Sequence, residues 1–156
     1  MKTLTTSLCL AGAMVAPGLA QAQAITLNTQ LKDYRGNDAY LAIYLTDAQG
    51  QYQQTLWVAG KKPKYYKHLR DWARGSGLQR SAFDGISGAS VGSGDNLSVA
   101  VELADSLIDA GYQIRIDSAV EDKRDNRAEV SVPLTRAGAG QPANGTGYVE
   151  SFSYDL

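Results

Sequence analysis

The chain has 156 residues, a formal net charge of −1, 44% hydrophobic residues and one cysteine. This length predicts one domain with its own core, and the near-neutral charge gives no basis for binding nucleic acid. The only cysteine, Cys9, lies in an apolar segment near the start. A chain that loses this segment has no disulfide, no zinc–thiolate site and no cysteine nucleophile.

The first predicted element is an export signal over residues 1–24. It has a positive start, an apolar run from Leu8 to Leu19, and small-residue cleavage sites that end at Ala22 or Ala24. The apolar run is too short to span a bilayer comfortably, and no later segment comes close to the required length. We therefore predict an exported, soluble protein of the bacterial periplasm, whose single domain covers residues 25–156.

Most of the remaining chain is predicted to form strands, because apolar side chains alternate with polar ones. The predicted strands are Tyr40 to Leu45, Thr55 to Ala59, Leu97 to Leu103, Tyr112 to Asp117, Ala128 to Leu134 and a last edge strand from Tyr148 to Tyr154. The first is apolar on both faces, as a central strand would be, and Pro133 favours an edge position or a strand end. A flexible loop is expected near residues 137–147. Short strands at this spacing predict an all-β, antiparallel sandwich.

One segment breaks the strand pattern. From Pro63 to Arg74, residues Tyr65, Leu69 and Trp72 lie at helical spacing, with Gly75 as the expected stop. This predicted helix carries a basic cluster: Lys61, Lys62, Lys64, Lys67, Arg70 and Arg74. Acidic residues outnumber basic ones between positions 95 and 125, so we expect one basic end of the domain and one acidic end.

The helix leads into a glycine-rich loop that contains the sequence Asp84-Gly85-Ile86-Ser87-Gly88-Ala89-Ser90. Glycines let a backbone approach another molecule closely, and their N–H groups can form an anion-binding nest. A serine nucleophile needs a base, and His68 is the only histidine of the chain, so a hydrolase triad is not supported. Ser90 is better suited to being modified by another enzyme.

This sequence resembles the acceptor motif of proteins modified by FAD:protein FMN transferases. In that motif an Asp precedes Ser/Thr-Gly-Ala and a final Thr or Ser, which receives FMN through a phosphoester bond. The resemblance implies that Ser90 is the attachment residue, that Ser87, Gly88 and Ala89 frame it, and that Asp84 is the motif acid. The usual acceptor is threonine, and this chain has serine at that position.

The chain from about residue 40 to residue 134 also resembles a family of predicted periplasmic proteins, domain of unknown function 2271. The resembling features are Ala42-Ile43-Tyr44, Leu56-Trp57, Gly111-Tyr112, the helix with Leu69 and Trp72, and the loop described above. The resemblance implies an immunoglobulin-like or fibronectin-like sandwich. It also implies an association with flavin transferases and with membrane-bound reductases of the PepSY type.

The ring of an attached FMN would need an aromatic surface, for which Trp57, Tyr65, Tyr66 and Trp72 are the candidates. The alternative for both tryptophans is a place in the core between helix and sheet. Tyr65 and Tyr66 are adjacent, so at most one of them faces the core. The acidic residues of the chain lack the regular spacing of a calcium loop, and we assign no metal site.

The sequence therefore predicts a periplasmic electron carrier with FMN attached covalently to Ser90, without catalytic turnover of its own. The alternative is a non-redox module that binds a protein partner or a small ligand through the loop and the basic helix. Under that alternative, loss of Lys64 and Lys67 would impair function more than loss of Ser90.

Overall fold

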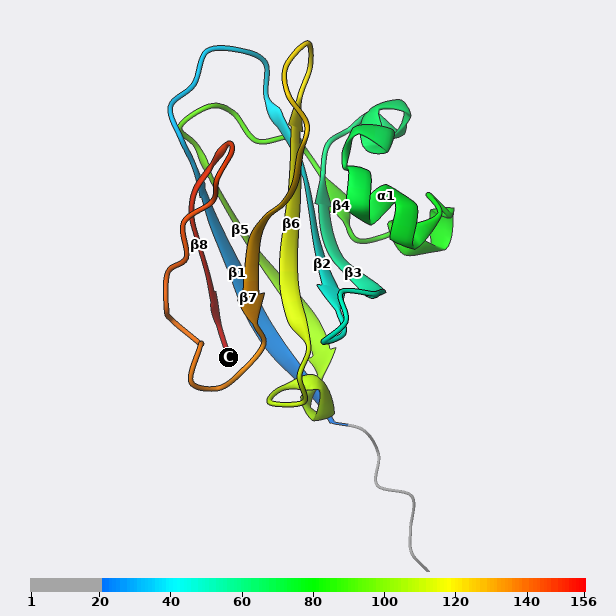
Figure 1. Cartoon of the computed structure of the whole chain (residues 1–156), viewed down its shortest axis with the longest axis vertical. Helices are drawn as coiled ribbons and strands as arrows, with labels where there is room; N and C mark the ends of the chain where they lie inside the picture. Colours follow the sequence, from blue (N-terminus) through cyan, green and yellow to red (C-terminus); the bar gives the residue numbers. More distant parts are fainter. Residues whose placement is uncertain (1–20) are drawn as a thin grey trace, which may run out of the picture.

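The structure is a computed structural model of the chain, and it describes residues 21–156. Residues 1–20 of the predicted export signal lie outside the described residues. The strands are β1 (Ala22–Leu31), β2 (Ala39–Thr46), β3 (Tyr52–Ala59), β4 (Ser87–Gly88), β5 (Asn96–Ala104), β6 (Gln113–Val120), β7 (Asn126–Pro133) and β8 (Val149–Asp155). They form a three-stranded sheet of order β5-β1-β8 and a five-stranded sheet of order β4-β3-β2-β6-β7 (Figure 1).

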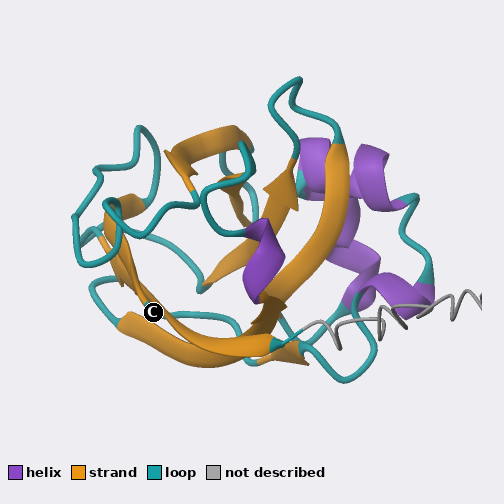
Figure 2. Ribbon diagram, turned by 90° about the horizontal axis from the view of Figure 1, so that it is seen from below, coloured by secondary structure: helices purple, strands orange, loops and turns teal. Residues whose placement is uncertain are grey.

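The two sheets face each other, and the helices cover the outer face of the five-stranded sheet (Figure 2). All strand pairs are antiparallel except β3 with β4, which is parallel. The predicted all-β sandwich with one short helix is confirmed. Among residues 21–156, no helix has the length and apolar character that a membrane crossing requires.

Strand β2 lies in the middle of the larger sheet and is buried on both faces, as its sequence predicts. Leu41, Ile43 and Leu45 point into the core between the sheets. Ala42 and Tyr44 point the opposite way, into a second apolar cluster under the helices. The alternation of a strand thus distributes one apolar run between two cores.

The strands at the sheet edges agree with the sequence prediction. Strand β7 is the edge of the larger sheet and ends at Pro133, which has no N–H to donate, and β8 is an edge of the smaller sheet. Strand β1 was not among the predicted strands, although Ile25 and Leu27 alternate with polar residues and are buried. Because Ile25 is the first buried residue of β1, cleavage after Ala22 or Ala24 leaves the core intact.

The single helix predicted from Pro63 to Arg74 is wrong, because this segment forms two helices. A 3₁₀ helix, η1 (Pro63–His68), is followed by α1 (Arg70–Ser76), and Leu69 separates them with non-helical dihedral angles, φ −83° and ψ 76°. The helix ends at Gly77 rather than at Gly75, because Gly77 adopts the left-handed conformation, φ 63°, that favours glycine at a helix C-terminus. The break also rotates Tyr66 rather than Tyr65 toward the core.

A buried carboxylate on strand β6 attaches α1 to the sheet. Asp117 is fully buried, and its Oδ2 accepts hydrogen bonds from the backbone N–H groups of Asp71 and Trp72, each at 2.8 Å. Its Oδ1 accepts from the Tyr44 hydroxyl at 2.9 Å and from the Ala128 N–H at 2.7 Å. Burial raises the pKa of Asp117. The carboxylate therefore caps the first turn of α1 from a distant strand.

Candidate functional site

The acceptor-like loop is held by main-chain hydrogen bonds on both sides of Ser90. On one side β4 pairs with the end of β3, where the Val58 N–H donates to Ile86 O at 3.0 Å and the Gly60 N–H donates to Gly88 O at 2.8 Å. On the other side Ala39 and Val91 exchange two hydrogen bonds, of 2.7 and 3.0 Å. Only residues 89 and 90 lie between these two anchors, so the position of Ser90 is fixed by its neighbours' backbones.

Gly88 is required by a close approach to a tryptophan. A Cβ atom added at Gly88 would lie 2.7 Å from Cζ2 of Trp57, which no ordinary side chain could tolerate without displacement. Trp57 itself is half-buried against the main core. The loop therefore lies directly on the edge of this indole ring.

Ser90 is half-buried, and among residues 21–156 its hydroxyl has one side-chain partner. Its Oγ donates a hydrogen bond to Oδ2 of Asp38 at 3.1 Å. Asp38 is exposed and immediately precedes Ala39, the residue that bridges to Val91. The same main-chain bridge thus positions both the hydroxyl and the carboxylate.

The other motif residues have more exposed positions. Ser87 and Ala89 are exposed, and Asp84 is exposed at the turn before β4. Oδ2 of Asp84 lies 3.7 Å from Nε of Arg80, and 58% of the Asp84 side chain is accessible. An exposed ion pair of this kind contributes little to stability, so Asp84 has no evident structural role.

A groove of about 560 Å³ adjoins the loop. It is lined by Gly60, Lys61, Pro63, Tyr66, Arg80, Phe83, Asp84, Gly85, Ser87, Gly88 and Ala89. The lining thus includes two cations, two aromatic rings and the motif residues that precede Ser90. The Phe83 and Tyr66 rings meet edge to face with their centroids 5.2 Å apart.

The four aromatic stacking candidates occupy different environments. Trp72 is completely buried, and its Nε1–H donates to the Thr55 hydroxyl at 2.8 Å. It therefore has no free face and belongs to the core, which was the alternative interpretation. Tyr66 is only 2% exposed and donates from its hydroxyl to Gly60 O at 2.7 Å. It presents at most a ring edge to the groove.

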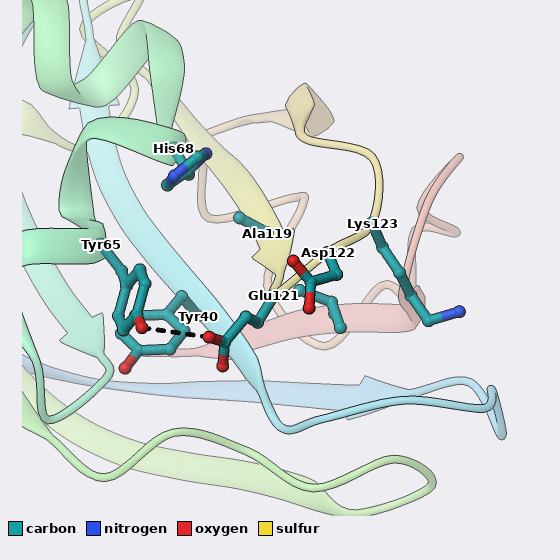
Figure 3. Close-up of a pocket in the computed structure, with 8 residues that line it drawn as sticks. Tyr40, Tyr65, His68, Ala119, Glu121, Asp122 and Lys123 are labelled. Atoms are coloured by element: carbon teal, nitrogen blue, oxygen red, sulfur yellow. Dashed lines mark hydrogen bonds between the residues drawn. The ribbon is translucent and has the colours of Figure 1, made fainter.

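Tyr65 lies at a different hollow, of about 240 Å³, which shares no lining residue with the groove beside the motif. Figure 3 shows Tyr65 and Tyr40 together on one side of it, with the Tyr65 hydroxyl bonded to Glu121. That hydrogen bond is 3.0 Å long, and it raises the pKa of Tyr65. The structure therefore does not bring Tyr65 together with the motif loop.

The basic cluster begins with Lys61 and Lys62, just before η1, and continues along η1 and α1. Among residues 21–156, its four lysines make no ion pair, whereas Arg70 Nε lies 2.7 Å from Asp125. Asp125 also contacts His68, and Asp117 and Glu121 contact the same helical region. The predicted separation into a basic and an acidic end is therefore wrong, because part of the acidic segment packs beside the basic helices. Within residues 21–156, no cluster of His, Cys, Asp or Glu is placed to hold a metal ion.

Comparison with known protein families shows to which family this chain belongs. A family described as predicted periplasmic proteins, domain of unknown function 2271, matches residues 22–151. The chain belongs to this family. The periplasmic location predicted from the sequence is confirmed by this description. Searches of curated proteins and of solved structures found no match.

Sequence reasoning missed three residues that the fold places at this site. Asp38 is 52 positions away from Ser90, and its contact follows only from the pairing of Ala39 with Val91. Phe83 and Arg80 line the groove because the chain turns through a short 3₁₀ helix (Arg80–Ala82) after α1. The sequence offered a signal for Arg80, since an arginine four residues before Asp84 can form an ion pair across one turn.

Proposed function

We propose that this protein is a periplasmic flavoprotein that carries FMN in a phosphoester bond to Ser90. It would act as an electron-transfer component of an extracytosolic reductase system, with a FAD:protein FMN transferase and a membrane-bound reductase of the PepSY type as partners. The protein supplies attachment and orientation, and the flavin supplies the redox chemistry. The observation that carries this proposal is a motif hydroxyl held at the surface by backbone anchors on both sides.

The surroundings of Ser90 suit modification by another enzyme. A transferase has to enclose the hydroxyl, so bulky neighbours would obstruct it. Here Ser90 follows a glycine and an exposed alanine, and its hydroxyl has a single side-chain partner within the part of the chain that the structure describes. The anchored backbone also reduces the conformational entropy lost when the loop enters the transferase.

The groove beside the loop has room and suitable chemistry for a flavin. Its volume of about 560 Å³ lies within the range of about 300–1,000 Å³ that is usual for small-molecule sites. Lys61 and Arg80 provide positive charge for phosphate and for a reduced, anionic ring, and Phe83 provides an aromatic surface. We therefore place the ring of attached FMN in this groove, and not on Trp72 or Tyr65.

The basic cluster supports a role of this surface in the association of the protein with anionic molecules. The exposed lysines of η1, including Lys64 and Lys67, continue from Lys61 at the margin of the groove. A positive surface of this kind accelerates the approach of an anionic flavin donor or of an acidic redox partner. The charges would therefore change association rates more than the strength of the final complex.

Intact-mass measurement on protein co-expressed with an active FAD:protein FMN transferase tests the proposal. The wild-type mass should rise by one FMN less one water, and the purified protein should be yellow. Ser90→Ala should remove the added mass, whereas Ser90→Thr should retain it because the hydroxyl remains. Ser87→Ala is the matched control, since it removes the other motif hydroxyl and should still be modified.

Two results would overturn the proposal. One is an unmodified, colourless wild-type protein under conditions in which the same transferase modifies a known acceptor. The other is an added FMN that persists in Ser90→Ala. A colourless protein whose partner binding depends on Lys64 and Lys67 would instead support the non-redox binding module.

A further inference from the structure

The hydrogen bond between Ser90 and Asp38 joins two segments that lie far apart in the chain. Ser90 Oγ donates to Asp38 Oδ2 at 3.1 Å, and the two residues are separated by 52 positions. Each residue immediately precedes one partner of the Ala39–Val91 bridge. That bridge consists of two main-chain hydrogen bonds. Because it fixes the backbones next to both residues, it places the Asp38 carboxylate beside the Ser90 hydroxyl.

We propose that Asp38 accepts the proton of Ser90 when FMN is transferred, so that the acceptor protein contributes a catalytic residue to its own modification. This inference rests on the proposed function. Asp38 lies outside the motif that contains Ser87, Gly88, Ala89 and Ser90. It contacts the reacting oxygen directly.

The transfer is a phosphoryl substitution with no change of oxidation state. Ser90 Oγ forms a bond to the phosphorus of the FMN half of FAD, and the bond from that phosphorus to the bridging oxygen of the AMP half breaks. The bridging oxygen leaves with the electron pair, as AMP. The Oγ–H bond breaks at the same time, and its proton passes to the Asp38 carboxylate and then to solvent.

A serine hydroxyl needs this assistance, because it is a weak nucleophile while it keeps its proton. In protein kinases an aspartate accepts the proton of a substrate hydroxyl during phosphoryl transfer. The contact suits this role, because a carboxylate can only accept, so the Ser90 hydroxyl donates to it and keeps its oxygen lone pairs available.

The negative charge of Asp38 has a second, opposing effect, because it repels the phosphates of FAD. Asp95 allows the two effects to be separated. Asp95 lies on the loop that contains Ser90. A Cβ atom added at Gly92 would be 2.5 Å from Asp95 Oδ2 and 3.7 Å from Asp38 Oδ1, so both carboxylates lie close to Gly92. Asp95→Asn therefore makes the same change of charge nearby, at a carboxylate that no hydrogen bond joins to Ser90 in the described residues.

The test is the initial rate of FMN attachment as a function of acceptor concentration, followed by intact mass with purified transferase and saturating FAD. Asp38→Asn should lower the maximal rate by about tenfold to a hundredfold, with the acceptor concentration at half-maximal rate unchanged. Asp38→Glu should recover part of the rate, and Asp95→Asn should stay within about twofold of the wild type. Thermal unfolding of each variant checks that the fold is retained.

The outcomes are distinguishable. An Asp38→Asn variant modified as fast as the wild type, or faster, would overturn the role of Asp38 while leaving the proposed function intact. Equal losses in Asp38→Asn and Asp95→Asn would overturn it as well, because charge alone would then explain the effect. A wild-type protein that accepts no FMN would overturn the proposed function and this inference with it.

Discussion

Two aspartates of this molecule bind distant segments, and they do so in opposite ways. Asp117 is fully buried under α1 and accepts four hydrogen bonds, three of them from backbone N–H groups. Asp38 is exposed beside the acceptor-like loop and accepts one hydrogen bond from the described residues 21–156, that of the Ser90 hydroxyl. The first carboxylate uses all its acceptor capacity for the fold, whereas the second keeps capacity free.

Burial and hydrogen bonding separate the structural role of one aspartate from the chemical role of the other. A buried carboxylate is tolerated only when its hydrogen bonds are satisfied, so Asp117 has no capacity left for a reaction. An exposed carboxylate with a single hydroxyl partner contributes little to stability, and its contact can break during a reaction. The burial of a carboxylate and the number of hydrogen bonds that it accepts therefore distinguish a structural role from a chemical one, whereas the residue type does not.

The largest expected effect is a loss of stability when the buried Asp117 is replaced. Asp117→Asn replaces one carboxylate oxygen by an NH₂ group, which would face N–H donors that it cannot satisfy. We expect the free energy of unfolding to fall by about 3 kcal/mol. Asp38→Asn is the matched control, and we expect a change of less than about 0.5 kcal/mol. Urea denaturation measures both, and equal losses would show that burial does not separate the two carboxylates.

A smaller effect is expected where the loop lies on Trp57. Gly88→Ala places a methyl group 2.7 Å from Cζ2 of the indole ring, and we expect a loss of about 1–3 kcal/mol from overpacking. The loop should shift, and Trp57 fluorescence should change. In a Trp57→Leu background the same substitution should cost much less, because the ring atom is gone. An equal cost in both backgrounds would exclude this contact as the reason for glycine.

The smallest effect concerns the cations of the groove. The double variant Lys61→Ala and Arg80→Ala should slow FMN attachment by about threefold to tenfold at low salt, because steering of the anionic donor is lost. The difference from the wild type should disappear at about 0.5 M salt, where the Debye length is only a few ångströms. Stability should not change measurably, since both side chains are exposed. A rate difference independent of salt would contradict steering.

The sequence predicted the features that depend on local patterns. The two-sided burial of β2 and the end of β7 at Pro133 follow from alternation and from proline chemistry. The break at Leu69 was not predictable from spacing, because the Tyr66 and Trp72 rings on its two sides pack edge to face, and the Trp72 N–H donates to Asp117 of β6. Tertiary contacts of this kind override local propensity.

The candidate site was predictable only in part. The motif residues are consecutive, so a pattern in the sequence reveals them. Asp38 is brought to the loop by strand pairing across 52 positions. Phe83 directly precedes Asp84 and lines the groove because of the turn after α1, and no pattern in the sequence marks either residue. Trp57 is predicted as a stacking surface, and the structure places one edge of its half-buried ring against Gly88.

Tandem mass spectrometry can locate FMN on a single residue of the chain. The protein would be co-expressed with an active FAD:protein FMN transferase, digested, and searched for the peptide that contains residues 84–90. We predict FMN on Ser90 and none on Ser87. FMN on Ser87 or on a residue outside this loop, or no FMN at all beside a modified positive control, would contradict the proposal.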